Sequence, residues 1–420
     1  MTVSIAGGRK PQNPWLRCVG CGAETPLGAE FEGCSRCRRS GEPQPVEVVY
    51  DYPALAFPDF GAGANGQRGL WRFRALLPLP SGEDPVTLAE GDTPLAELPT
   101  PGPGRIWLKD ETRNPTGTFK DRFHSVSVSM ARHLGFSKVT AATTGNHGTS
   151  LAAYAARGER RCLVFCDPAA SDLHRQLMQL FGARVVTLAN RAQHLAWLVR
   201  ERGWYPSTSA SPLPVSTPYG VEGYKTIAYE VVHQLGRVPA LVFAPVAGGD
   251  SLYGVWKGFW ELQRLGVAAA VPRMIAVQSS GCDPLVEAFR RGERRVGVHP
   301  SPHTIATSIG DETGGPLALK AVYDSGGSAI AVSDADIIDA VRRLAATGIA
   351  VEPASAASFA AALAAQSAGG LGEDQDAVCL LTGALARWPD ALKQVTERHE
   401  CRDESPAGCR AWIAAFDAAG

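Results

Sequence analysis

The sequence predicts an α/β protein with two domains and mostly parallel sheets, preceded by a small cysteine-paired unit. From Lys138 onward, short apolar runs alternate with segments of helical periodicity, which is the pattern of α/β layers. The runs are largely continuous, as strands buried on both faces of a parallel sheet should be. Two Cys-x-x-Cys pairs precede that alternation, between residues 18 and 37, and they predict a separate unit held by a metal.

Composition limits the classes of function. The chain has 420 residues, enough for two or three domains, and 45% of them are apolar. A formal net charge of −1 provides no basic field for nucleic acid. No apolar run is long enough to cross a membrane, and residues 1–15 lack the apolar segment of a signal peptide. We therefore expect a cytoplasmic protein whose ten cysteines are reduced thiols or metal ligands.

The first unit, residues 1–50, contains the four paired cysteines Cys18, Cys21, Cys34 and Cys37. Each pair can wrap a tight turn around one metal ion, and four thiolates complete a tetrahedral zinc site. Four protein ligands leave no open position, so we expect a structural zinc in a zinc-ribbon-like unit. A redox pair and a chance spacing are the alternatives. Residues 51–104 are rich in Pro and Gly and predict a linker that wraps the body of the protein.

The body begins with an expected strand at 105–108, a loop of turn-forming residues at 114–118 and a helix at 123–134. An earlier strand at 46–52 and a helical turn at 71–74 precede it. Further strands are expected at 139–142, 162–165, 184–188, 241–246, 273–278, 329–332 and 378–381, and helices at 151–157, 173–181 and 253–265, with another ending at 200. Residues 398–420 predict a C-terminal helix or extension without chemistry.

One lysine stands where the 114–118 loop meets the helix that follows. Lys120 comes directly after Phe119, in a chain that has only eight lysines. An amine can lose its proton and can form a Schiff base, whereas a guanidinium cannot. Lys120 is therefore a candidate for amine chemistry. A solvated lysine at the start of a helix is the alternative.

Three further segments have the residues of an anion or cofactor site. Residues 143–147, Thr-Thr-Gly-Asn-His, lie between a strand and a helix, where backbone N–H groups can bind an anion. Residues 247–251, Ala-Gly-Gly-Asp-Ser, follow the strand at 241–246, and their glycines let the backbone approach a phosphate. Thr382 directly follows the strand expected at 378–381. An ordinary turn or strand end is the alternative for each segment.

The segment Asn-Pro-Thr-Gly-Thr-Phe-Lys-Asp-Arg, residues 114–122, resembles the pyridoxal-phosphate lysine motif of threonine synthases and related enzymes of the tryptophan-synthase-β-like fold. The resemblance can be followed through most of the chain. It implies a two-domain enzyme of fold type II with the cofactor in the cleft between the domains. The large, cofactor-binding domain would span 105–123 and 226–395, the small domain that binds the substrate carboxylate 124–225, and a C-terminal extension 396–420.

The resemblance also implies a role for each motif. Lys120 would hold pyridoxal 5'-phosphate and, once released, act as the general base at Cα, and Phe119 would pack against the pyridine ring. Asn146 matches the partner of the cofactor's phenolic oxygen, and Thr382 matches the partner of the ring nitrogen. The cofactor phosphate would bind to Ala247, Gly248, Gly249, Asp250 and Ser251, and the substrate carboxylate to Thr143, Thr144, Gly145 and His147.

Two positions depart from the family pattern. Asp250 would repel the cofactor phosphate if it pointed inward, so we expect it to face outward or to cap the following helix. Many threonine synthases have an arginine, which we interpret as a contact to the substrate phosphate, where this chain has Gly220. Lys225 is the nearest basic residue in the sequence.

The expected reaction is elimination or replacement at Cβ or Cγ of a small amino-acid substrate, because a hydroxyl at Thr382 leaves the ring nitrogen largely neutral. The best single prediction is a threonine synthase, which releases phosphate from O-phosphohomoserine and adds water. One alternative is a β-replacement or dehydratase reaction on serine, threonine or O-phosphoserine, as in cysteate synthase or an ammonia-lyase. Another is a catalytically silent protein that binds partners through its ribbon. We also expect a homodimer.

Overall fold

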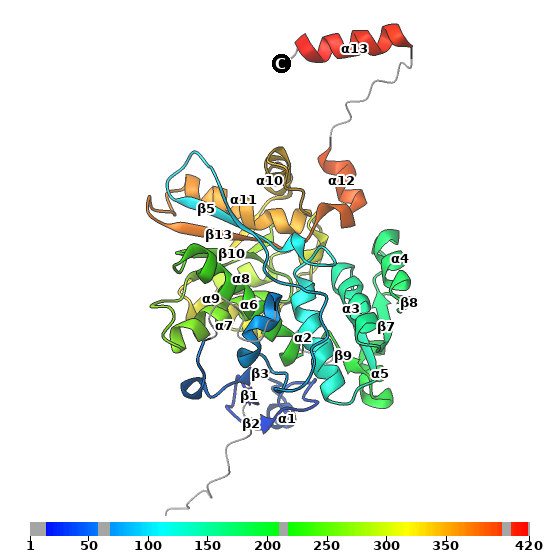
Figure 1. Cartoon of the computed structure of the whole chain (residues 1–420), viewed down its shortest axis with the longest axis vertical. Coiled ribbons are helices and arrows are strands. Elements are labelled where there is room, and N and C mark those ends of the chain that lie inside the picture. The colour runs from blue at the N-terminus through cyan, green and yellow to red at the C-terminus, as the bar shows by residue number, and fades with distance from the viewer. Residues whose placement is uncertain (1–13, 58–67, 210–216, 397–404, 419–420) are drawn as a thin grey trace, which may run out of the picture.

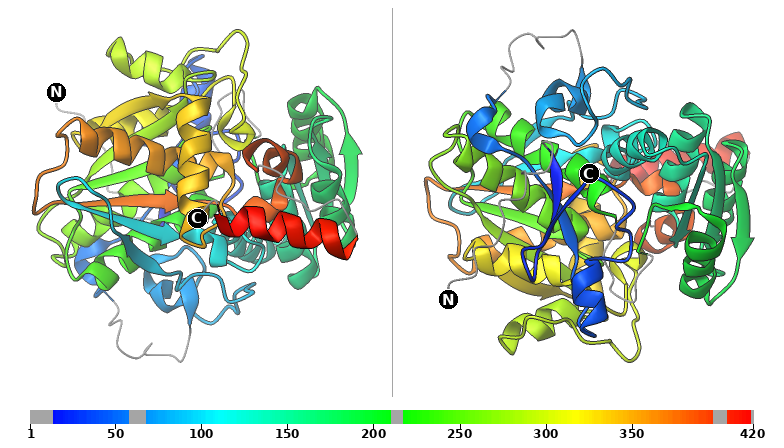
Figure 2. Two further views of the ribbon diagram at one scale, coloured as in Figure 1. Left: turned by 90° about the horizontal axis from the view of Figure 1, so that it is seen from above. Right: turned by 90° about the horizontal axis from the view of Figure 1, so that it is seen from below.

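The computed structural model describes residues 14–57, 68–209, 217–396 and 405–418. Two sheets with their helices form the body, and a three-stranded unit near the N-terminus lies below them in Figure 1. Both views of Figure 2 show the smaller sheet and its helices on one side of the larger layer. The predicted α/β fold with mostly parallel sheets is confirmed.

The larger sheet has six strands in the order β12-β11-β10-β13-β5-β4. Its neighbours pair in parallel, except that β4 runs antiparallel to β5 at the edge. Every residue of β10 and β13 is buried, which explains why these two strands are almost entirely apolar in sequence. The strands are β4 (Leu95–Leu98), β5 (Arg105–Asp110), β10 (Leu241–Pro245), β11 (Arg273–Ser279), β12 (Ser328–Val332) and β13 (Asp376–Leu381).

Helices connect and cover the strands of the larger sheet. They are α7 (Asp250–Arg264), α8 (Pro284–Arg290), α9 (Pro316–Asp324), α10 (Asp334–Ala346) and α11 (Pro353–Ser367). Helix α11 is rich in alanine and buried along most of its length, because it packs between α10 and the sheet. Helix α10 begins with a capping box in which Ser333 and Asp336 bind each other's backbone N–H.

The smaller sheet has four parallel strands in the order β8-β7-β6-β9. Its elements are β6 (Lys138–Thr143), α3 (Asn146–Arg157), β7 (Arg161–Cys166), α4 (Asp172–Leu180), β8 (Arg184–Thr187), α5 (Arg191–Arg202) and β9 (Tyr205–Pro206). Strand β9 has only two residues, and the sequence analysis did not predict it because a strand of that length has no periodicity.

Two helices, α2 (Lys120–His133) and α6 (Pro218–Leu235), join the two layers. Helix α6 packs along both α2 and α7, and glycines allow the close approach. A Cβ at Gly223 would lie 2.0 Å from the Arg122 carbonyl oxygen of α2, and a Cβ at Gly258 of α7 would lie 2.3 Å from the Lys225 carbonyl oxygen. Because α6 continues across residues 225 and 226, the predicted domain boundary falls inside a helix, and the domain limits stay predictions.

Helix α6 also carries a buried ionic group that we call the Glu222 cluster. The Lys225 ammonium lies 2.6 Å from Glu222 Oε2 and 3.1 Å from Glu261 Oε2. Lys257 lies 2.5 Å from the other Glu222 oxygen, and the Tyr50 hydroxyl donates to Glu222 at 2.8 Å. Tyr50 follows the last strand of the N-terminal unit, so the cluster connects that unit to the body.

The N-terminal unit contains β1 (Trp15–Cys18), β2 (Glu24–Pro26), α1 (Ser35–Arg39) and β3 (Val46–Val49), with the strand order β2-β1-β3. The predicted strand at 46–52 ends earlier, at Val49, because Tyr52–Ala54 forms a 3-10 turn with a proline inside it. The predicted turn at 71–74 lies within a longer 3-10 segment, Gly69–Leu76. Other 3-10 turns are Glu111–Arg113, Thr307–Ile309 and Leu385–Arg387.

The C-terminal segment contains α12 (Pro389–Val395) and α13 (Pro406–Ala418), as the predicted C-terminal helix requires, although part of that prediction lies outside the described residues. Figure 1 shows α13 apart from the body. Within the described ranges, no helix combines the length and the apolar character that a membrane span needs.

Candidate active site

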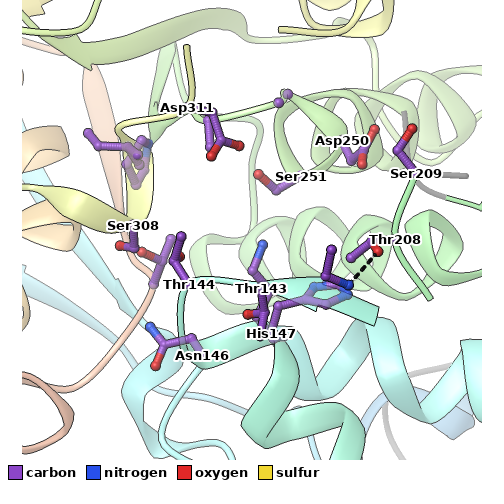
Figure 3. A pocket seen from close by; sticks show the side chains of 18 of the residues that line it. Thr143, Thr144, Asn146, His147, Thr208, Ser209, Asp250, Ser251, Ser308 and Asp311 are labelled. Atoms are coloured by element: carbon purple, nitrogen blue, oxygen red, sulfur yellow. Dashed lines mark hydrogen bonds between the residues drawn. The ribbon is translucent and has the colours of Figure 1, made fainter. Parts of the chain in front are cut away.

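A cavity of about 320 Å³ opens between the two sheets (Figure 3). Its walls come from the carboxyl ends of β6, β10 and β13 and from the start of α2, which is where open parallel sheets bind ligands. The sequence-predicted residues that line it are Phe119, Lys120, Thr143, Thr144, Asn146, His147, Ala247, Gly248, Gly249, Asp250, Ser251 and Thr382. The loops chosen from sequence therefore meet in one place.

Gly145 is the predicted site residue that does not line the cavity. Its N–H donates to Thr143 Oγ1 at 3.0 Å, and a Cβ at this position would lie 2.9 Å from the His174 ring. Gly145 therefore shapes the loop from behind, and its backbone N–H is already bonded. The N–H of Gly145 is therefore engaged with Thr143 and does not face a substrate carboxylate, as the sequence prediction would require.

Lys120 is the first residue of α2, and its ammonium faces two aromatic rings. Its Nζ lies 4.5 Å from the Phe119 ring centre and 5.6 Å from that of Tyr224, and the two rings stack on each other at 5.0 Å. Burial lowers the pKa of Lys120, while the charges of Asp250, Asp311 and Glu352 oppose that shift. Among the described residues, Lys120 has no ion-pair partner.

The loop after β6 is held in place from both sides. Thr143 Oγ1 also accepts from the N–H of Gly148, at 3.1 Å, which fixes the start of α3. Asn146 Nδ2 donates to Glu352 Oε2 at 2.8 Å, and its Oδ1 lies 3.2 Å from His174 Nε2. Glu352 precedes α11 of the larger layer, so the Asn146 amide connects the two layers across the cavity.

At the opposite wall, the loop after β10 ends on the N-terminus of α7. Gly249 has φ +101°, and a Cβ there would lie 2.2 Å from the Ala318 Cβ, so both its conformation and its surroundings require glycine. Thr382 Oγ1 lies 3.0 Å from Ser355 Oγ, and either hydroxyl group can be the donor. The cavity therefore combines an amine, a helix N-terminus and a hydrogen-bonded hydroxyl group.

A sequence profile described as "Pyridoxal-phosphate dependent enzyme" matches residues 86–383. The chain belongs to this family. The predicted resemblance and the predicted class of enzyme, dependent on pyridoxal phosphate, are thereby confirmed.

Relatives within this pyridoxal-phosphate family include threonine synthases. That of Methanocaldococcus jannaschii is 35% identical over 398 residues, which cover 91% of this chain and 95% of the relative. That of Mycobacterium bovis is 36% identical over 327 residues, which cover 76% of this chain and 88% of the relative. Both matches extend well beyond the lysine motif.

Solved structures give the same fold for the pyridoxal-phosphate family. A fungal L-serine ammonia-lyase from Rhizomucor miehei has a TM-score of 0.62 at 24% identity, with 74% of this chain and 100% of that chain covered. Threonine deaminase isoform 2 from Solanum lycopersicum has a TM-score of 0.60 at 20% identity, with 70% and 82% covered. At these identities, the likeness supports the fold alone.

The residues of the cavity fit pyridoxal phosphate, with one departure. An amine lies in the cavity, and a glycine-containing helix N-terminus offers N–H groups for a phosphate. The departure is Asp250, for which we expected an outward or capping position. That expectation is wrong: Asp250 lines the cavity (Figure 3), and the N-cap residue of α7 is Gly249 and not Asp250.

Several cavity residues were missed by the sequence analysis: Arg191, Thr208, Ser209, Tyr224, Ser308, Asp311 and Glu352. They come from segments far apart in the chain. Burial raises the pKa of Asp311 and of Glu352. Of these residues, Glu352 occupies a position that can be recognised in the sequence, because it precedes the proline that starts an alanine-rich helix. That position indicates a helix cap and does not by itself indicate a residue of the cavity.

Gly220 lies on α6, and its surroundings explain the departure seen in the sequence. A Cβ at this position would lie 2.3 Å from Cζ of Phe123, so the Phe123 ring occupies the space beside it. An arginine at 220 would require Phe123 to move. Lys225 does not take its place, because both Glu222 and Glu261 bind its ammonium inside the protein.

The paired cysteines of the N-terminal unit come together as predicted. The Sγ atoms of Cys18, Cys21, Cys34 and Cys37 all lie within 4.8 Å of one another. The Cys18–Cys37 and Cys21–Cys34 Sγ distances are both 3.7 Å. Four sulfur ligands at ~2.3 Å from a tetrahedral zinc would be about 3.8 Å apart, so the cluster fits a zinc ion.

Proposed function

We propose that this protein is a threonine synthase, which converts O-phosphohomoserine and water into threonine and phosphate. The observation that carries the proposal is the match to the Methanocaldococcus jannaschii threonine synthase over 91% of this chain at 35% identity. The cavity supports it, because Lys120, the loop proposed for the substrate carboxylate and the loop proposed for the cofactor phosphate all line it.

Each part of the site then has a task. Bound pyridoxal phosphate supplies the electron sink that makes the substrate's C–H bonds acidic. Lys120 is the base, because its lowered pKa leaves more of the amine neutral near pH 7 than in an exposed lysine. The hydroxyls of Thr143 and Thr144, at the N-terminal end of α3, bind the substrate carboxylate. Asn146 and Thr382 orient the cofactor ring, in line with the family roles.

Borohydride tests the role of Lys120. Reduction of the yellow enzyme followed by peptide mapping should place the cofactor on Lys120. Label on another lysine would remove Lys120 from the proposal. A purified protein with no cofactor absorbance and no reducible lysine would instead favour the catalytically silent alternative.

We assign the substrate phosphate to Arg191. Its guanidinium lines the cavity at the start of α5, and Asp167 holds it through a salt bridge. Apart from Lys120 and the histidine, it is the basic side chain on the described walls of the cavity. A charge-assisted hydrogen bond from an arginine contributes roughly 1.5–3 kcal/mol, or about one to two powers of ten in affinity.

The substrate is tested by comparing kcat/KM for O-phosphohomoserine, O-phosphoserine, serine and threonine. O-phosphohomoserine should be best in the wild type. Arg191→Gln should reduce kcat/KM for phosphorylated substrates about 10- to 100-fold and change the others little. Arg175→Gln, outside the cavity on α4, is the control. An equal loss for every substrate would contradict the role of Arg191.

A second function is favoured by one observation. Asp250, Asp311 and Glu352 all line the cavity, and three carboxylates disfavour a substrate with its own phosphate. They favour β-replacement or dehydration of serine or threonine. The same comparison decides between the two functions: if serine or threonine has the highest kcat/KM, the threonine synthase proposal fails.

We also propose that Cys18, Cys21, Cys34 and Cys37 bind one structural zinc. Elemental analysis should find about one zinc per chain, and a variant with Cys18→Ser and Cys21→Ser should lose it and lose stability. A folded, metal-free protein that is inactive would contradict a purely structural role. The expected homodimer and cytoplasmic location are proposals too, and light scattering of the purified protein tests the first.

A further inference from the structure

A chain of hydrogen bonds runs from the cavity into the protein between α2 and α3. His147 lines the cavity (Figure 3), and its Nε2 lies 3.2 Å from Nε2 of His124. His124 Nδ1 lies 2.9 Å from Ser150 Oγ, which donates to Asp121 Oδ1 at 2.6 Å. His124, Ser150 and Asp121 have no exposed surface.

The acceptors at the two ends determine where the hydrogens lie. The Ser207 carbonyl oxygen, 2.8 Å from His147 Nε2, can only accept, so this nitrogen carries the hydrogen. His147 Nε2 then has no lone pair, so His124 Nε2, at 3.2 Å, is a second acceptor that shares this hydrogen with the Ser207 carbonyl oxygen. The Nδ1–H of His124 donates to Ser150, which donates to Asp121. From His147 to Asp121, each hydrogen bond therefore points away from the cavity. His147 Nδ1 remains as the ring nitrogen for which the described residues provide no partner.

We propose that His147, His124 and Ser150 form a proton relay between the cavity and the buried carboxyl group of Asp121. The proposal rests on the proposed function. From O-phosphohomoserine to threonine, Cβ loses one hydrogen as it gains a hydroxyl, and Cγ gains one as it loses phosphate. Lys120 can carry one proton at a time, so a second acceptor that connects to the cavity lets Cβ lose its proton while Lys120 is occupied.

The transfer balances without a further reagent. A proton arrives at Nδ1 of His147, and the Nε2 proton of this ring passes to His124 Nε2. The Nδ1 proton of His124 passes to Ser150, whose own proton passes to Asp121. Both rings and the hydroxyl end neutral, and Asp121 is protonated. The reverse sequence returns the proton to the cavity for Cγ.

The electrostatics agree with this geometry. Burial lowers the pKa of His147 to about 3, and burial together with the neighbouring His147 lowers the pKa of His124 well below its usual value. The charge of Lys120 adds to both shifts, so a proton passes through these rings without resting on them. Burial raises the pKa of Asp121 to about 6. Ser150 and Thr116 donate to this carboxylate and oppose the rise, Glu90 adds to it, and the charge of Arg387 also faces it.

Ser150→Ala tests the relay, because it removes the middle hydroxyl and keeps both rings and the carboxylate. We expect kcat for threonine formation to fall by roughly 100-fold with KM little changed. In the wild type, kcat should fall as the pH drops through about 6, since protonated Asp121 cannot accept. That inflection should disappear in Ser150→Ala, and Ser150→Thr, which restores the hydroxyl, should recover both. Ser129→Ala, a buried serine of α2 outside the relay, is the control for packing.

A second measurement needs no substrate and no variant. Nitrogen-15 NMR of histidine-labelled protein should find the hydrogen on Nε2 of His147 and on Nδ1 of His124. The opposite tautomers, or a Ser150→Ala enzyme with unchanged kcat and an unchanged pH profile, would overturn the relay. A wild-type enzyme that forms no threonine would contradict the proposed function instead of the relay. The tautomers of the two histidines would then still test the direction of the hydrogen bonds.

Discussion

Lys120 and Lys225 lie on two helices that pack together, but Lys120 is half-buried at the cavity whereas Lys225 is fully buried, and their surroundings differ. The Lys225 ammonium contacts Glu222 and Glu261 at 2.6 and 3.1 Å, and the Tyr50 ring centre lies 4.2 Å from it. Lys120 lies beside two aromatic rings, and its nearest acidic groups influence it only through their charge.

The two lysines differ both in burial and in partners, and of the two it is Lys225 whose ammonium is bound by carboxylates. Such ion pairs offset part of the hydration that a buried ammonium loses. An ammonium that loses hydration without gaining such partners is less stable in its charged form. Its pKa therefore falls toward the pH at which the neutral amine can act as a base. Four experiments test this difference between the two lysines.

Lys120→Met should have the largest effect. We expect activity to fall by at least ~10³-fold, because the variant has no amine to hold the cofactor or to take a proton. The free energy of unfolding of the cofactor-free protein, measured in urea, should not fall, since an ammonium without an ion pair is removed. A stability loss as large as that of Lys225→Met would contradict the comparison.

Lys225→Met should have the opposite profile. It leaves Glu222 with Lys257 alone and Glu261 without its lysine, so unfolding should require about 3 kcal/mol less, at the low end for a broken buried pair. Activity per folded molecule should remain. Lys393→Met, which breaks an exposed pair with Asp390, is the matched control and should cost under ~1 kcal/mol. Equal losses in the two variants would contradict the structural role of the Glu222 cluster.

Tyr50→Phe tests the edge of the same cluster. It removes the 2.8 Å hydrogen bond to Glu222 and keeps the ring beside Lys225. We expect a loss of about 1.5 kcal/mol in the free energy of unfolding, typical of a hydrogen bond to a charged group, and no change in kcat. A thermal scan that finds an unchanged Tm would show that the N-terminal unit does not depend on this bond.

The smallest effect concerns pH. Because the pKa of Lys120 is lowered in the folded protein, the unfolded chain binds more protons between the folded value and about 10.4, and stability should rise with pH across that window. Urea unfolding of the cofactor-free wild type and of Lys120→Met should therefore show a shallower pH slope for the variant. Parallel slopes would mean that the pKa of Lys120 is not displaced.

The sequence could predict the loops of the site because each one follows a strand of a parallel sheet. Thr143, Ala247 and Thr382 stand at or just after the ends of β6, β10 and β13, and such ends converge in this kind of fold. Lys120 could be found because an amine suits the expected chemistry and because the residue follows a loop of turn-forming residues at the start of a helix. These are properties of short segments, which a sequence displays directly.

The remaining features depend on contacts between distant segments. Asp250 was expected to turn away from a phosphate, and the backbone conformation of Gly249, which takes the cap position, places it in the cavity instead. Gly220 suggested a missing contact, but the position is filled by Phe123 of another helix. The role of Lys225 could have been suspected, since Glu222 stands three residues before it at helical spacing, although nothing in that spacing shows Glu261.

The pairing of β5 with β13 has a consequence for how the protein is made. Arg105 pairs with Asp376, so the strand that leads to Lys120 has β4 as its neighbour at once but must wait for 271 more residues (376 minus 105) before its parallel neighbour β13 exists. At about 5–20 residues per second, a ribosome needs on the order of 15 to 50 s to supply them. During this time the cavity lacks the wall that Thr382 and the end of β13 provide, so the cofactor site is complete only when the last strand of the sheet has left the ribosome.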